Sequence, residues 1–185
     1  MAKGTFLQQK GGYRNLVVYR ISEIVYDITY YFANKYLSKH NRTIDQMIQA
    51  ARSGKQNIAE GSEAATTSSE TEIKLTNVAK ASLEELLIDY EDYLRVRGMS
   101  LWNKEHPRYE RLRRYCKSDA FMTGYRDLLT RLNEEEMCNM AITLINQATY
   151  MLKRLIEHQQ KMFLENGGVR EQMMRARIEY RKNNK

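Results

Sequence analysis

Apolar residues recur at spacings of three and four over four long stretches of the chain, and each stretch predicts an amphipathic helix. The expected helices cover residues 13–38, 43–61 or a little beyond, 69–97 and 133–165. The last is the most regular, because its apolar stripe continues from Met137 to Phe163 on one face. Long helices joined mainly by short links predict an all-α protein, an antiparallel up-down-up-down four-helix bundle.

Several residues mark the expected ends of these helices. The connection 64–72 ends in capping-box spacing, which leaves Thr67 and Ser69 as alternative caps of the third helix. Asn133 forms the same kind of pair with a glutamate three residues later, at the start of the fourth helix. The two glycines in residues 166–168 predict its end.

The second helix carries an irregularity in its apolar stripe. Gly54 weakens the helix, and Lys55 projects toward the apolar side, which favours a kink or a helix edge. Lys55 then extends its ammonium group to solvent, or alternatively meets a phosphate. Small residues such as Ala51 and Ala79 indicate that the second and third helices cross closely.

The remaining segments divide the chain. Residues 1–12 are polar and predict a flexible N-terminal arm, and residues 13–165 form the expected bundle. Residues 98–132 predict a helical insertion between the third and fourth helices, with Pro107 in the first turn of a short basic helix. Residues 166–185 form a basic C-terminal tail that could be another helix.

The first helix presents a second row of large side chains opposite its apolar stripe. These four residues are Tyr19, Tyr26, Tyr30 and Leu37. Tyrosine hydroxyls tolerate water, so the row could be a solvent face. We favour an oligomer interface, because aromatic side chains are enriched at protein contacts.

Charge adds a possible partner. The chain has 30 basic and 23 acidic residues, a formal charge of +7, and residues 95–117 alone hold eight basic and two acidic residues. Basic side chains interleaved with tyrosines can bind nucleic acid through phosphate contacts and stacking, although they also serve solubility. The predicted nucleic-acid-binding residues are Arg108, Arg111, Arg113, Arg114, Lys117, Arg175, Arg177 and Arg181.

No pattern of catalytic, cofactor-binding or metal-binding residues is present. The histidines His40, His106 and His158 are isolated, and no glycine-rich nucleotide loop occurs. Cys116 and Cys138 lack metal or redox spacing and suit a reducing compartment. Without an apolar leader or a membrane-spanning run, we expect a soluble, cytoplasmic protein with no cofactor and no enzymatic activity.

Three runs stand out in the first half of the chain: QNIAEGS at 56–62, SSE at 68–70 and VAKASLEEL at 78–86. They resemble the four-helix-bundle proteins encoded in intervening sequences of bacterial large-subunit ribosomal RNA genes. The end of the chain carries FLENGGVRE at 163–171, followed by Met174, Arg177, Tyr180 and Arg181. These residues resemble the four helix bundle suffix branch of this family.

This resemblance covers about residues 15–97 and 137–181 and implies a pentameric ring of up-down-up-down bundles without catalytic activity. It also implies suspected nucleic-acid binding, since the accessory variability determinant of diversity-generating retroelements looks like a distant relative. Many members carry an Ile-Pro pair where this chain has Gly54 and Lys55. The sequence therefore predicts a homo-oligomeric protein that binds RNA or DNA electrostatically. The alternative is a scaffold module that binds a partner protein.

Overall fold

The computed structural model describes residues 12–38 and 42–183, and these residues form helices and no strands. The all-α prediction is therefore confirmed for this part of the chain. The long helices are α1 (Val17–Tyr36), α2 (Thr43–Ala64), α3 (Ser69–Val96) and α6 (Glu134–Asn166). The short elements are a 3-10 turn (Tyr13–Asn15), α4 (Tyr109–Tyr115), α5 (Asp119–Leu129) and α7 (Val169–Asn183). The predicted flexible arm, apart from Gly12, lies outside the described residues.

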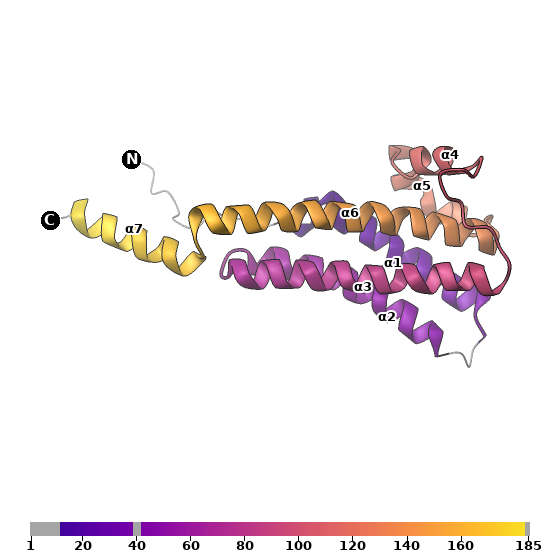
Figure 1. Ribbon diagram of the computed structural model, residues 1–185, viewed down its shortest axis with the longest axis horizontal. Coiled ribbons are helices and arrows are strands. Elements are labelled where there is room, and N and C mark those ends of the chain that lie inside the picture. The colour runs from indigo at the N-terminus through magenta and orange to yellow at the C-terminus, as the bar shows by residue number, and fades with distance from the viewer. Residues whose placement is uncertain (1–11, 39–41, 184–185) are drawn as a thin grey trace.

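The four long helices pack in a closed cycle of contacts. Helices α1 and α3 each pack against both α2 and α6, and consecutive long helices run in opposite directions (Figure 1). Apolar side chains from all four meet inside this cycle and lose their contact with water. The largest fully buried side chains of the long helices include Phe32, Met47, Leu83, Leu86, Tyr90, Leu144 and Ile145.

The helix ends partly follow the sequence prediction. The cap of α3 is Ser68, whose hydroxyl oxygen accepts a hydrogen bond from the Thr71 backbone N–H at 3.1 Å. The expected caps Thr67 and Ser69 were therefore wrong by one residue, because Ser68 is the residue with extended backbone at this end. Asn133 forms the complete capping box with Glu136 that its spacing predicted.

Helix α2 continues from Thr43 to Ala64 without a break at Gly54, where the sequence predicted a kink or a helix edge. A Cβ atom at Gly54 would lie 2.7 Å from Leu83 Cδ2, which means that this glycine lets α2 and α3 approach closely. Ala79 is fully buried at the same crossing, as the small-residue pattern predicted. The ammonium group of Lys55 lies 4.5 Å from the centre of the Tyr26 ring, a cation–π contact at the helix edge.

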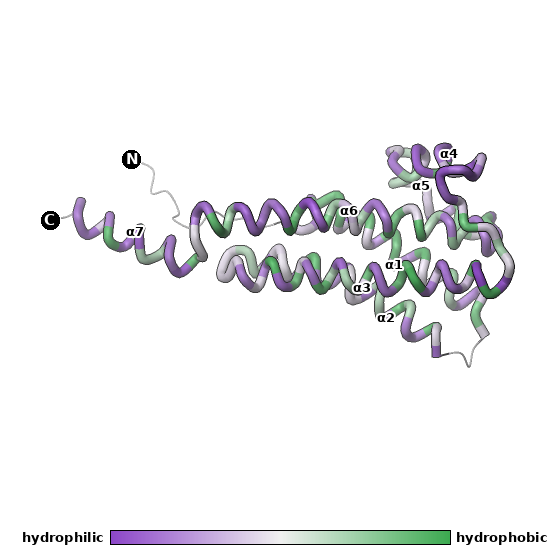
Figure 2. Tube along the Cα trace, in the orientation of Figure 1, coloured by the Kyte–Doolittle hydropathy of each residue, from purple (hydrophilic) through white to green (hydrophobic). Residues whose placement is uncertain are grey.

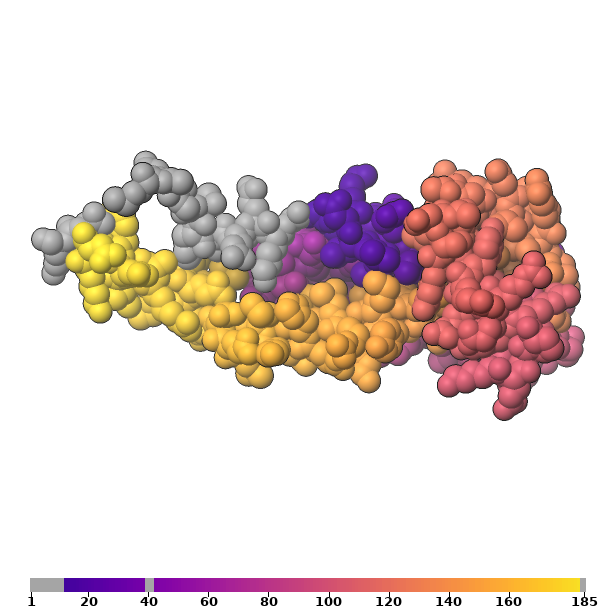
Figure 3. All heavy atoms as spheres, turned by 90° about the horizontal axis from the view of Figure 1, so that it is seen from above, coloured from indigo at the N-terminus to yellow at the C-terminus, as the bar shows by residue number. Residues whose placement is uncertain are grey.

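The segment between α3 and α6 forms a lobe at one end of the long helices, and α7 projects from the other end (Figure 3). Helix α5 packs on α1, where the Tyr125 hydroxyl donates to Asp27 Oδ2 at 2.5 Å. Helix α4 begins at Tyr109, so Pro107 precedes the helix and does not occupy its first turn. No helix in residues 12–38 or 42–183 is both long and apolar enough to cross a bilayer.

Candidate nucleic-acid interface

A groove of about 640 Å³ lies between the lobe and the outer side of α6. One wall comes from residues 101–104 and from α4, and the other comes from the stretch of α6 between Ile142 and Tyr150. Hydrophilic residues predominate along α4 (Figure 2). The shape of the groove therefore depends on how firmly the segment before α4, residues 98–108, is held against α6.

Asn139 fixes that segment to α6. Its side chain is only 1% exposed. Its Oδ1 accepts from the Trp102 backbone N–H at 2.7 Å, and its Nδ2 donates to the Ser100 carbonyl oxygen at 2.9 Å. A buried amide that satisfies two backbone groups of a loop determines the path of that loop.

Glu135 holds the same segment one helical turn earlier. Its carboxylate accepts from the Ser100 backbone N–H at 3.1 Å and from the Trp102 indole N–H at 3.0 Å. The bond from Ser100 and then the bond from Trp102 lower the pKa of Glu135 below its ordinary value. Both donors therefore favour the charged carboxylate.

Arg108 belongs to this anchored structure. Its guanidinium lies 5.1 Å from the centre of the Trp102 ring and donates to Glu136 Oε1 at 3.2 Å. The His106 ring stacks on the same indole, with 5.0 Å between ring centres. Arg108 was predicted to contact nucleic acid, and its side chain is 60% exposed while it makes these contacts.

Three cations line the groove. Arg113 and Lys117 come from the predicted set, and Lys104 was not among the predicted residues. Arg113 forms an ion pair with Glu110 of the same helix, with 3.1 Å between Nη1 and Oε1. Glu91 of α3 is the one carboxylate among the described residues that line the groove, so the cations outnumber the acids there.

The opposite wall offers an aromatic ring and amide groups. Tyr150 is 65% exposed, and half-buried Tyr109 lines the groove from α4. The Nε2 atom of Gln147 is buried and has no hydrogen-bond partner among the described residues. Because this atom is buried, a carbonyl or phosphate oxygen would reach it only after the amide rotated toward the groove.

The other predicted basic residues lie elsewhere. Arg111 and Arg114 are exposed on α4 but do not line the groove. Arg175, Arg177 and Arg181 lie on α7, beyond the far end of α6. The 33 residues of α6 span about 50 Å at 1.5 Å per residue. The predicted set of nucleic-acid-binding residues is therefore divided within one chain between the lobe and α7, at opposite ends of α6.

The predicted oligomer interface on α1 is also divided. Tyr19 and Leu37 are buried within the chain, so their placement on an outward face is wrong. The Tyr13 ring covers Tyr19, with 4.7 Å between ring centres, because the 3-10 turn folds over the start of α1. Tyr26 is half-buried and Tyr30 is 54% exposed, which leaves a small outward remnant of the row.

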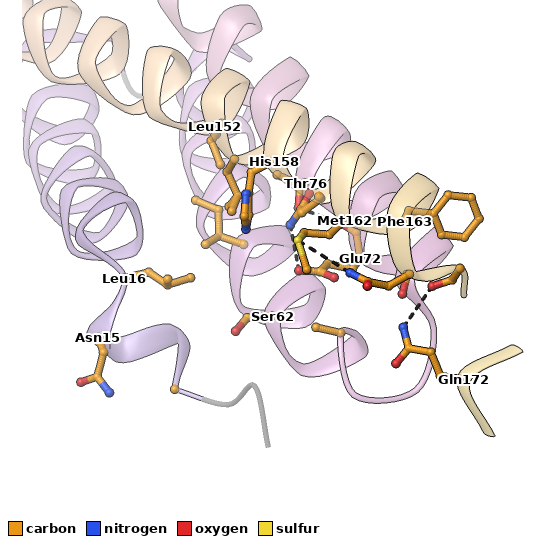
Figure 4. A pocket seen from close by; sticks show the side chains of 18 residues that line it. Asn15, Leu16, Ser62, Glu72, Thr76, Leu152, His158, Met162, Phe163 and Gln172 are labelled. Atoms are coloured by element: carbon orange, nitrogen blue, oxygen red, sulfur yellow. Dashed lines mark hydrogen bonds between the residues drawn. The ribbon is translucent and has the colours of Figure 1, made fainter. Parts of the chain in front are cut away.

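A second cavity, of about 360 Å³, lies at the other end of α6 (Figure 4). Inside it, Gln159 Nε2 donates to Glu72 Oε1 at 2.9 Å and to Thr76 Oγ1 at 3.1 Å. The described residues that line this cavity include no lysine or arginine. It is therefore poorly suited to phosphate, in contrast to the groove.

Other reactive groups do not form a site. The described histidine, cysteine and carboxylate side chains make no cluster of three that could hold a metal ion. Burial raises the pKa of the Cys116 thiol to about 12, and burial also raises the pKa of Cys138. Both thiols therefore stay protonated and unreactive at neutral pH.

Besides Lys104, the sequence interpretation missed four residues that build the groove: Glu135, Asn139, Gln147 and Tyr150. A weak signal existed for Tyr150, a large aromatic residue that stands outside the apolar stripe of the last helix. Glu135 and Asn139 fit a regular helix pattern, so the sequence did not indicate that they bind the loop at residues 100–102.

A scan against protein-family models, a search of curated proteins and a search of solved structures each found no match to this chain.

Proposed function

We propose that this chain is a non-catalytic protein that binds single-stranded RNA or DNA in the groove between α4 and α6. The observation that carries the proposal is the meeting of three cations with an exposed tyrosine in one groove. Phosphates would lie along the α4 wall, and a base would stack on Tyr150. Single strands suit such a site, because their bases are free to stack on aromatic side chains.

The proposed mechanism is mainly electrostatic. Lys104 and Lys117 form no ion pair with the described acidic residues, so their charges remain available to phosphate. Each phosphate contact releases counterions, so the affinity falls as the salt concentration rises. Gln147 adds one hydrogen-bond donor, which is too little for sequence-specific reading.

The absence of catalysis belongs to this proposal. Cys116 and Cys138 are buried with raised thiol pKa values, and the described histidines, cysteines and carboxylates form no cluster of three that could hold a metal ion. We also propose that the cycle of α1, α2, α3 and α6 is an up-down-up-down four-helix bundle of the ribosomal RNA intervening-sequence family. The resemblance of residues 56–62 and 78–86 supports this assignment, and cytoplasmic location remains a prediction from the sequence.

Self-association into a ring, a pentamer as the family resemblance implies, is part of the same proposal. Exposed apolar side chains on α7 support it, because such residues on a solvent face favour a protein contact. The same observation favours the second candidate function, a scaffold that binds a different protein. Only the first candidate function includes nucleic-acid binding, so a binding measurement distinguishes the two.

The first experiment measures fluorescence anisotropy of a labelled 20-nucleotide single-stranded RNA, the matching DNA strand and its duplex. Tyr150→Ala should weaken binding of both single strands roughly tenfold, the loss expected for one stacked base. Tyr30→Ala is the matched control, because Tyr30 is similarly exposed but lies on α1. Duplex binding should change little in either variant.

Two results would contradict the proposal. If the wild type binds none of the three probes at low salt, the scaffold function replaces the nucleic-acid function. If Tyr30→Ala and Tyr150→Ala weaken binding equally, the groove is not the site.

A further inference from the structure

Helix α7 stands apart from the other helices in its packing. Of its 15 residues, only Val169 is buried. Met174 is 65% exposed, and Met173 and Ile178 are also exposed. Figure 2 shows apolar and polar residues alternating along this projecting helix. Three large apolar side chains on a helix in water indicate a surface that another protein covers.

The first turn of α7 is nevertheless fixed in place. Gln172 Nε2 donates to the Gly167 carbonyl oxygen at 3.1 Å beside the cavity (Figure 4). A Cβ atom at Gly168 would lie 3.1 Å from Glu70 Oε1, so the helix starts close against α3. From this base the rest of α7 points away from the long helices (Figure 1).

One face of α7 combines apolar side chains with cations and holds no acid. At 100° per residue, the three arginines of this face lie between Met173 on one side and Met174 with Ile178 on the other. This face consists of Arg170, Met173, Met174, Arg177, Ile178 and Arg181. Glu171 lies at the edge of this face, next to Ile178, and pairs with Arg175 at 3.7 Å, while Glu179 lies on the opposite side. The helix therefore separates a purely basic face from a mixed one.

The outer face of α3 has the complementary composition. Ile88 is 58% exposed, and Val78 is exposed on the same side. Glu85 lies between Val78 and Ile88 along the helix, Asp92 follows Ile88, and both acids are exposed. Half-buried Asp89 lies close to both of them. Burial first, and then the charges of Glu85 and Asp92, raise the pKa of Asp89. Asp92 already pairs with Arg95 of its own helix at 2.7 Å, whereas Glu85 and Asp89 form no ion pair with the described basic residues. An approaching cation would relieve the repulsion that Glu85 and Asp89 exert on each other.

The spacing of charges agrees between the two faces. Arg170 and Arg177 are seven residues apart on α7, and Glu85 and Asp92 are seven residues apart on α3. Each pair therefore spans about 10.5 Å along its helix. Two such helices can pair both arginines with both acids while their apolar residues pack between them.

We propose that the basic face of α7 docks on the outer face of α3 in a second copy of this chain. The two surfaces differ, so the contact is head-to-tail, and repeated contacts close into a ring if the rotation permits. The proposal rests on the proposed self-association but not on nucleic-acid binding. Docking within one chain would require α7 to reverse at its fixed base, because Glu85 lies 15 residues beyond Glu70 along α3.

Multi-angle light scattering after size exclusion, without nucleic acid, tests this contact. Arg170→Glu with Arg177→Glu places acids opposite acids, and should reduce the mass to the 21.9 kDa of one chain. Glu85→Arg with Asp92→Arg should do the same. Combining all four substitutions restores opposite charges and should restore the mass of the wild type.

The control is Arg175→Glu with Lys182→Glu, the same charge change on the other side of α7, and it should keep the wild-type mass. Circular dichroism of every variant checks that the helices are retained. If the wild type assembles but the combined variant does not, α3 is not the docking surface. A monomeric wild type would instead overturn the self-association itself.

Discussion

The lobe segment 98–117 and helix α7 are both rich in arginine, yet the structure holds them in different ways. The lobe segment is anchored on α6 by Asn139 and Glu135, which bind its backbone and its tryptophan. Helix α7 is fixed only at its first turn and leaves apolar side chains exposed. Similar composition therefore gives an anchored segment in one place and a helix with exposed apolar side chains in the other.

The difference lies in the environment of the cations. In the lobe segment, Arg108 contacts Trp102 and Glu136. Arg113 and Lys117, farther along the same segment, line the groove. On α7, three arginines share a face with methionine and isoleucine. Counting charges along the sequence cannot distinguish these cases, because the distinction depends on residues of other helices.

The largest effect is expected from removing the anchor. Asn139→Ala leaves the buried Trp102 N–H and the Ser100 carbonyl without their partners, which should cost about 3 kcal/mol in the free energy of unfolding. Urea denaturation measures this loss. The comparison is Met174→Ala on α7, which should change stability by no more than about 0.5 kcal/mol. Equal effects of the two substitutions would mean that the lobe segment is not anchored more firmly than α7.

A smaller effect is expected from the indole. Trp102→Phe keeps most of the ring but removes the N–H that bonds Glu135, which should cost about 1 kcal/mol in the same measurement. An unchanged denaturation midpoint would show that the indole bond adds nothing to the anchoring.

Acidity should loosen the lobe without affecting α7. The folded state lowers the pKa of Glu135, so its stabilising contribution is present at neutral pH and is lost as the pH falls below the ordinary value of 4.5. Trp102 is the only tryptophan, so its emission should shift to longer wavelength in that range. Glu135→Gln should remove this transition. Emission that stays constant until the helices unfold would contradict the anchoring role of Glu135.

The sequence predicted the long helices well because their apolar stripes are set by local spacing. It also identified Asn133 as a cap, because a capping box lies within four residues. It misjudged Gly54, whose role depends on Leu83 of another helix, and Tyr19, which is covered by Tyr13. The groove was missed for the same reason: its anchors contact residues more than 30 positions away.

The salt dependence of RNA binding tests the central claim that the two basic regions have different roles. Lys104→Gln with Lys117→Gln should weaken binding of the single-stranded RNA and make the slope of log K against log salt shallower by about 0.7 per lost contact. Arg175→Gln with Lys182→Gln removes the same charge from α7 and should leave that slope unchanged. If both variants reduce the slope equally, binding follows overall charge and the groove is not the site.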